Sequence, residues 1–302
     1  MADTAQAPQV PTPQFDDVEP IRIEHPFVEF LKAYSRNYAA IAGFLVFLLI
    51  VASALLAPVL IGGDPFDIVW VPFSPPGQDG YILGTDSLGR DLFVSIVYGS
   101  RATLAVGGAA AGLTIFIGLT IGALAGYYRG WVDEILMRIT EFFQVLPPLL
   151  LAMVLVSLFS PTLETVAIAI GVVSWTGVAR LARAEFMRIR ELEFVKAARS
   201  IGARDRRIIW RVILPNALPP LIVNAALTVG IAILFEAALS FLGLSDPNVM
   251  SWGKLIGDNR DFLLDYPWMV TFPGVAIFLT VLAMSLIGDG LNDAFNPKLR
   301  ER

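Results

Sequence analysis

The pattern of hydrophobic and polar positions is dominated by long uncharged runs that alternate with polar segments. The first run covers residues 39–60 and the second covers 102–127, and neither contains a charged residue. A helix needs about 20 residues to cross a bilayer core, and Leu, Ile, Phe and Val favour insertion. Both runs are therefore predicted to be transmembrane helices. In the second, Gly118, Gly122 and Gly126 share one helix face, where another helix can approach closely.

Four further apolar runs predict four more spans. They cover about residues 135–159, 166–182, 217–239 and 268–287. Pro147 and Pro148 are expected to kink the third span. One soluble core could not bury so many apolar residues. The chain is therefore predicted to be an all-α integral membrane protein with about six transmembrane helices.

The polar segments around the spans are also informative. Residues 1–37 are rich in Pro, Gln and acidic residues, which predicts a mostly disordered tail ahead of a membrane domain at 38–302. This tail does not resemble a signal peptide, because the first apolar run begins only after Arg36. In the segment 86–98, apolar residues fall on one helical stripe, so an amphipathic helix along the outer membrane surface is expected.

The basic residues are distributed unevenly between the two sides of the predicted membrane domain. With both termini in the cytoplasm, 18 of the 22 Lys and Arg residues lie inside, and four lie in the extracytoplasmic segments 61–101 and 240–267. Cytoplasmic loops are usually the basic ones, so this orientation is predicted. The net charge of −5 argues against binding to nucleic acid.

Little in the composition supports catalysis by the chain itself. The sequence has no cysteine, its one histidine is His25 in the tail, and none of its lysines belongs to a Gly-Lys-Ser/Thr phosphate-binding loop. We expect no metal, no bound cofactor and no enzymatic activity. A secondary transporter or channel and a membrane-embedded enzyme remain alternatives, although no internal repeat and no catalytic arrangement favours either of them.

The most distinctive polar segment is a loop at 183–215, between the fourth and fifth spans. Its part 191–216 reads ELEFVKAARSIGARDRRIIWRVILPN. Small residues, then Gly202 as a helix C-cap, then an apolar and basic helix stopped by Pro215 predict two short helices joined by a tight turn. The loop is either a docking element for a partner or a hairpin that only connects two spans and whose basic residues set the topology.

This loop resembles the EAA loop of binding-protein-dependent ABC importer permeases. The matching positions are Ala197, Ala198, Gly202, Val212, Leu214 and Pro215. Lys196 stands where the loop's usual Glu is found, and Val212 replaces Ile. Peptide-type members commonly lack that Glu, so the departure narrows the subtype.

Four other segments resemble the second, C-type permease of the peptide/nickel branch of these importers. They lie at 83–101, 125–138, 236–244 and 287–298. The resemblance implies a type I importer permease fold in a bacterial inner membrane. It also implies as partners a paralogous second permease, two cytoplasmic ATPase subunits that bind ATP and Mg, and an extracytoplasmic solute-binding protein. Dipeptides, oligopeptides, glutathione, nickel chelates, opines and oligosaccharides all remain open as solutes.

The resemblance also implies which residues contact the ATPase. These are Glu193, Phe194, Val195, Lys196, Ala197, Ala198, Gly202, Ala203, Leu214 and Pro215. Small Ala197 and Ala198 allow close approach of a partner, and Phe194 or Val195 could be the anchor. Gly202 would let the chain turn back at once.

Two further groups are weaker candidates. Residues of span five that could line the translocation path or gate are Asn224, Thr228 and Glu236. Residues that could contact the binding protein are Asp86, Arg90 and Asp91. For the first group, hydrogen bonds between helices or to backbone are the alternative, and for the second group it is a local salt bridge and helix cap.

Overall fold

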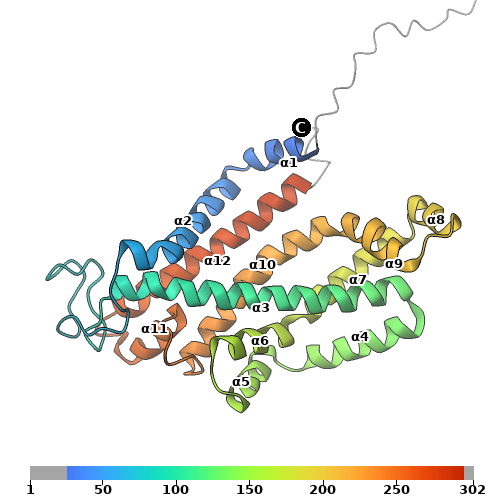
Figure 1. Cartoon of the computed structure of the whole chain (residues 1–302). Coiled ribbons are helices and arrows are strands. Elements are labelled where there is room, and N and C mark those ends of the chain that lie inside the picture. Colours follow the sequence, from blue (N-terminus) through green and yellow to red (C-terminus); the bar gives the residue numbers. More distant parts are fainter. Residues whose placement is uncertain (1–25, 296–302) are drawn as a thin grey trace, which may run out of the picture.

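All six predicted spans are helical in the computed structural model, which describes residues 26–295 (Figure 1). Four helices are long and apolar enough to cross a membrane singly, and two bent helix pairs bring the number of candidate spans to six. The helices are α1 (Pro26–Ser35), α2 (Tyr38–Leu60), α3 (Leu92–Tyr128), α4 (Gly130–Val145), α5 (Pro148–Leu158), α6 (Leu163–Ser174), α7 (Thr176–Arg190), α8 (Glu193–Ser200), α9 (Asp205–Arg207), α10 (Leu214–Phe241), α11 (Trp252–Asn259) and α12 (Trp268–Phe295). The expected all-α fold is thus confirmed for the described residues.

The segment 86–98 does not form a separate surface helix. Its residues from Leu92 onward are the first two turns of α3, which starts where the Asp91 side chain accepts hydrogen bonds from the N–H groups of Phe93 and Val94. The helix continues without a break through Gly99, which packs against Trp252 of α11. Of the apolar stripe, Leu92 is buried and Ile96 packs against the cluster of Trp252, whereas Leu88 is 54% exposed. The expectation of a separate amphipathic helix over 86–98 was wrong.

Proline bends the third span as expected. α4 and α5 meet at an angle of 85°, with Leu146 and Pro147 in extended conformation between them. A residue that precedes proline is disfavoured in the α region, which explains why α4 ends before Pro147. The fourth span is also bent, by 46° between α6 and α7 at the buried Trp175, which the sequence did not predict.

Pro215 does not stop a helix. The π-helix η1 (Ile208–Ile213) follows α9 and leads directly into α10, and 205–241 forms one continuous candidate span. Proline is tolerated at the first turn of a helix, and Pro215 occupies that place in α10. The expectation of two short helices therefore holds for α8 only, because the second is the start of span five.

The glycine face of α3 makes a close contact with a neighbouring helix. A side chain at Gly118 would meet Val178 at 2.6 Å, and one at Gly126 would meet the carbonyl oxygen of Arg183 at 2.6 Å. α3 therefore lies directly against α7, as Figure 1 shows. The predicted close approach at these glycines is confirmed, and α7 is the neighbour.

Helix α1 lies within the tail that was expected to be mostly disordered. It packs on the end of α12 through the rings of Phe30 and Phe295, whose centroids are 5.0 Å apart. The Asn37 side chain caps α2 and donates to Asp293 Oδ2 at 2.8 Å. Residues 1–25, including His25, and 296–302 lie outside the described part.

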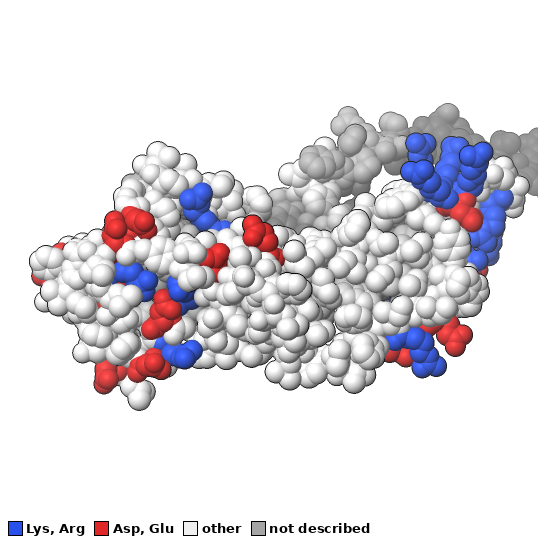
Figure 2. All heavy atoms as spheres, turned by 60° about the horizontal axis from the view of Figure 1, so that its bottom comes forward, with Lys and Arg blue, Asp and Glu red and all other residues white. Residues whose placement is uncertain are grey.

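Charged side chains gather at the two ends of the molecule. Figure 2 shows Lys, Arg, Asp and Glu at both ends of one face and a band without charge between them. One end holds α11 and the 61–91 segment, and the other holds α8 and the α3–α4 turn (Figure 1). We refer to them as the α11 end and the α8 end. An uncharged band between charged ends is the surface of an integral membrane protein.

Candidate functional site

Helix α8 presents a small apolar surface at the α8 end. Phe194 is 46% exposed and Ile201, which follows the helix, is 85% exposed, and Ala197 between them is also exposed. These positions are three and four residues apart, so they share one face. Val195 is only 1% exposed and points inward, so Phe194 and not Val195 is available to a partner.

The turn after α8 has the geometry predicted for Gly202. The N–H of Ala203 donates to Ala198 O at 3.1 Å, and the N–H of Gly202 donates to Arg199 O at 3.0 Å. Gly202 has φ +79°, in the left-handed region that favours glycine. Together these are the two hydrogen bonds of a Schellman motif, so the predicted C-cap is confirmed.

Tyr127, at the end of α3, fastens the 183–215 loop to the membrane domain. Its buried hydroxyl donates to Asp205 Oδ1 at 2.6 Å. The guanidinium carbons of Arg190 and Arg199 lie 5.6 and 5.8 Å from its ring centroid, within cation–π range. Sequence reasoning gave Tyr127 no role, because its contacts come from α7, α8 and α9, far along the chain.

An apolar cluster beneath α8 completes this attachment. Val195 packs with Ile208 and Ile213 of the π-helix and with Phe186 of α7. Ala203 and Leu214 are partly buried against the same cluster. Val195 thus packs α8 against α7 and against the π-helix that leads into α10.

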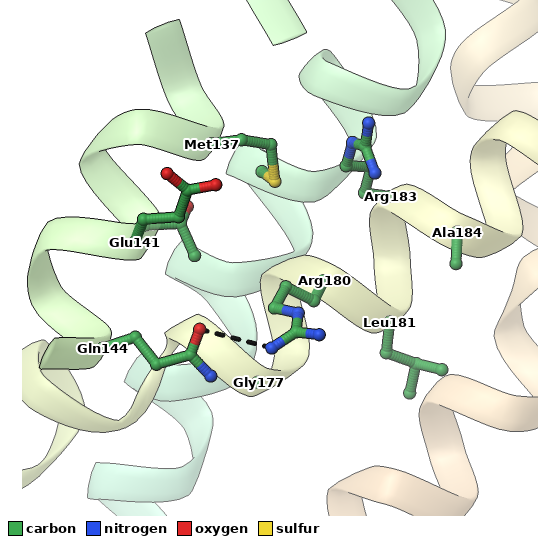
Figure 3. Close-up of a pocket in the computed structure, with 9 residues that line it drawn as sticks. Met137, Glu141, Gln144, Gly177, Arg180, Leu181, Arg183 and Ala184 are labelled. Atoms are coloured by element: carbon green, nitrogen blue, oxygen red, sulfur yellow. Dashed lines mark hydrogen bonds between the residues drawn. The ribbon is translucent and has the colours of Figure 1, made fainter. Parts of the chain in front are cut away.

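A polar pocket lies between α4 and α7 (Figure 3). It has a volume of about 760 Å³, and Glu141, Gln144 and Arg180 are among its lining residues. Arg180 Nη1 donates to Gln144 Oε1 at 3.2 Å across it. Sequence reasoning missed this pocket, since its walls come from separate spans.

An ion pair at the margin of this pocket ties its walls together. Arg183 of α7 makes two hydrogen bonds to Asp133 of α4, at 2.5 and 2.6 Å. Two parallel hydrogen bonds between a guanidinium and a carboxylate fix the relative orientation of the two side chains better than a single bond does.

None of the candidates in span five lines the polar pocket. Thr228 Oγ1 donates to the backbone oxygen of Asn224 at 2.8 Å, within α10. Glu236 is 2% exposed and accepts hydrogen bonds from Ser240 at 2.8 Å and Thr103 at 3.4 Å. Thr103 also accepts the N–H of Trp252, so this group joins α3, α10 and α11. A role for these residues in a path or gate stays a prediction.

The candidates at the α11 end are engaged within the chain. Asp86 and Arg90 are buried and form an ion pair at 2.5 Å, and Arg90 Nη2 also lies 3.4 Å from Asp258 Oδ2 of α11. Asp91 caps α3. These contacts are the local salt bridge between Asp86 and Arg90 and the helix cap at Asp91 that the sequence offered as the alternative to a partner contact. Within residues 26–295, no group of three or more Asp, Glu or His side chains is placed to hold a metal ion.

Six apolar spans and an exposed helix between the fourth and fifth define a polytopic membrane protein. The family described as binding-protein-dependent transport system inner membrane component matches residues 118–301. The N-terminal transmembrane domain of oligopeptide transport permease C matches residues 25–79. The chain therefore belongs to the binding-protein-dependent transport permeases, as a C-type permease of their dipeptide and oligopeptide branch.

Curated relatives cover nearly the whole chain. The dipeptide transport system permease protein DppC of Alkalihalophilus pseudofirmus is 40% identical over 91% of both chains. The glutathione transport system permease protein GsiD of Pectobacterium atrosepticum is 38% identical over 92% of this chain and 93% of its own. The oligopeptide transport system permease protein OppC of Bacillus subtilis is 35% identical over 89% of this chain and 88% of its own.

The fold has a solved counterpart. A chain of the MetNI methionine ABC transporter in an inward-facing conformation matches with a TM-score of 0.52 and 20% sequence identity. The match covers 65% of this chain and 93% of that chain. At this identity the match establishes the fold alone, which is the expected type I importer permease fold.

Proposed function

We propose that this chain is one of two nonidentical permease subunits of an ATP-driven importer and forms about half of its translocation pathway. The solute is a peptide or a related small molecule. Family membership and three relatives named for dipeptide, glutathione and oligopeptide transport support this proposal. Because such similar relatives carry the names of different solutes, we assign the choice of solute to the binding protein.

The observation that carries the coupling part of the proposal is the exposed face of α8. Phe194 and Ile201 are the apolar anchors that enter a groove of a cytoplasmic ATPase subunit, and Ala197 allows close approach. Val195, Ala203 and Leu214 support α8 from beneath, within the apolar cluster. Lys196 pairs with Glu193 at 3.1 Å on the exposed side of the helix.

Movement of the ATPase subunits reaches the membrane helices through the contacts beneath α8. The Tyr127 link and the π-helix join α8 to α3, α7 and α10. Rigid elements joined in this way convert closure at one site into helix displacement at another. ATP and Mg are bound by the ATPase partners, since none of this chain's lysines stands in a phosphate-binding loop.

The α8 end lies in the cytoplasm and the α11 end outside a bacterial inner membrane, with both termini inside. The unequal distribution of Lys and Arg supports this orientation. A cysteine introduced at Ser200 is expected to resist an impermeant maleimide in intact cells and to react after permeabilisation. Reaction in intact cells would show that the α8 end lies outside and would contradict the proposed orientation.

The polar pocket between α4 and α7 is the inner part of the solute path. Glu141, Gln144 and Arg180 belong to membrane spans, where polar side chains usually face a water-filled path. The hydrogen-bonded group around Glu236 lies where α3, α10 and α11 meet and serves as an outer gate. Asn224 and Thr228 belong to the same helix between these two regions.

The α11 end receives the solute-binding protein. Asp86, Arg90 and Asp91 contribute by holding the 61–91 segment and the start of α3 in shape, because their side chains are occupied by contacts within the chain. The residues that touch the binding protein are then exposed neighbours such as Leu88.

The proposal is tested by co-purification of tagged chain with a second permease and ATPase subunits. We expect a one-to-one ratio of the two permeases. The double variant Phe194→Ala/Ile201→Ala should weaken ATPase binding up to about a thousandfold, because buried anchor residues contribute about 2 kcal/mol or more each to such interfaces and about 1.4 kcal/mol corresponds to a factor of ten.

Ile82→Ala is the matched control, because Ile82 is an exposed isoleucine at the opposite end. It should leave ATPase retention unchanged. If the double variant retains as much ATPase as wild type, the exposed face of α8 is not the docking site. A transporting complex that contains only this permease and ATPase subunits would disprove the heteromer.

A further inference from the structure

The start of span five carries four arginines around one pocket. The pocket has a volume of about 480 Å³ and is lined by Arg204, Arg206, Arg207, Trp210 and Arg211. Trp210 is 60% exposed, and all four arginines are exposed as well. This surface therefore carries a strongly cationic pocket with an exposed indole ring.

The four arginines have no acidic partner within 4.0 Å among residues 26–295. Asp205, the acid within the segment, is occupied by the hydroxyl of Tyr127. Three other arginines of the chain each pair with a glutamate: Arg129 with Glu191, Arg138 with Glu141 and Arg188 with Glu185. The cluster thus has unused hydrogen-bond donors, which suit an anion supplied from outside the chain.

The exposed side of this helix changes from cationic to apolar along its length. One row of its exposed residues runs at intervals of three or four: Arg204, Arg207, Arg211, Pro215, Leu218 and Ile222. Asn216 is exposed beside this row. Trp210 lies next to the change. In a membrane protein this order corresponds to headgroup, interface and acyl chain, with tryptophan at the headgroup level.

We propose that this arginine cluster binds the phosphate of an anionic phospholipid in the cytoplasmic leaflet, an inference that uses the orientation proposed above. Guanidinium groups form paired hydrogen bonds with phosphate, and the lipid's acyl chains lie along Leu218 and Ile222. A cytoplasmic ATPase subunit fits the site less well, because it cannot follow a stripe that continues into the membrane. The exposed face of α8 already offers that subunit an apolar surface.

The test measures phosphatidylglycerol retained by the purified importer complex, by native mass spectrometry from mixed phosphatidylglycerol and phosphatidylcholine micelles. Wild type should retain phosphatidylglycerol selectively. The triple variant Arg204→Gln/Arg207→Gln/Arg211→Gln should bind it about a hundredfold more weakly, since each arginine near an anionic surface contributes roughly a fivefold preference. The triple Arg→Lys variant keeps the charges but not the paired hydrogen bonds, so its retention should lie between that of wild type and that of the Gln variant.

The matched control removes the same charge from arginines that already have partners. Arg129→Gln/Arg138→Gln/Arg188→Gln should retain phosphatidylglycerol like wild type. Unchanged retention in the cluster variant, or an equal loss in the control, would overturn the proposal. Loss of ATPase subunits from the cluster variant with unchanged lipid retention would also overturn it and assign the cluster to a protein interface.

If the cluster variant does not accumulate in cells, a salt titration of the wild-type complex still tests the proposal. Salt screens exposed charges, so phosphatidylglycerol retention should fall steeply as ionic strength rises, whereas phosphatidylcholine retention should not change. Retention of phosphatidylglycerol that is insensitive to salt would contradict the proposal. Because the readout is lipid binding, the result is independent of which solute is transported.

Discussion

The two ends of the molecule satisfy their polar groups in opposite ways. At the α11 end, Arg90 is buried between Asp86 and Asp258, and Asn259 accepts the N–H of Ser87. Lys254 pairs with Asp258 as well. The buried charges Asp86 and Arg90 at this end therefore have partners within the chain. Buried charges that lack partners cost several kcal/mol, so complete pairing is what such a compact polar region requires.

The α8 end leaves both charges and apolar side chains without partners in the chain. Phe194 and Ile201 are exposed on α8, and the arginines at 204–211 have no acidic partner among the described residues. The α11 end also exposes apolar side chains such as Ile82 and Leu88, so the two ends differ in how their arginines are paired rather than in apolar exposure. Substitutions at the α11 end should therefore reduce stability, and those at the α8 end should reduce assembly.

The largest expected effect on stability follows from Arg90→Met. The substitution leaves the Asp86 carboxylate buried with only the backbone N–H groups of Leu88 and Arg90 as donors. Because breaking a buried pair typically costs 3–5 kcal/mol and these donors remain, we expect a loss near the low end, about 3 kcal/mol. Thermal unfolding in detergent, followed by size-exclusion chromatography, measures it.

Arg138→Met is the control for this prediction. It removes the same charge from the exposed pair with Glu141, whose atoms are 3.4 Å apart. Exposed pairs contribute about 1 kcal/mol or less, so the melting temperature should barely change. If the two variants unfold at the same temperature, the contrast between the two ends is not one of stability.

A smaller effect on stability, with a large effect on transport, is expected from Gly202→Asp. A side chain at φ +79° costs about 1 kcal/mol, and no atom lies within 4 Å of the added Cβ, so the permease should still fold and insert. The new charge lies on the docking side of the turn, so uptake and ATPase retention should be lost. Both are measured on membranes with matched expression.

Gly243 provides a matched control at the other end. It has φ +83° with open space around it, and it ends α10 with the same pair of hydrogen bonds. Gly243→Asp should therefore cost as much stability but leave ATPase retention intact. Loss of retention in both variants would show that strain in a turn, rather than docking at α8, explains the effect of Gly202→Asp.

Local signals in the sequence predicted the features that depend on nearby residues. The six spans follow from apolar runs, the bend at Pro147 from two prolines, and the cap at Gly202 from a glycine after a short helix. Each depends on residues within a few positions of one another. The same local view failed at 86–98, because the apolar stripe at the start of α3 packs on Trp252, over 150 residues away.

The sequence by itself determined the membrane class, the family and the position of the exposed loop, because hydropathy and motifs are properties of short segments. Tertiary structure alone decided that Phe194 faces outward while Val195 is buried. Both side chains are apolar and point in different directions from the helix, so the sequence does not say which of them the rest of the protein covers. It also decided that Tyr127 holds the loop and that Glu141 and Arg180 share a pocket. Such contacts join separate spans, and only the packing of helices against one another brings those residues together.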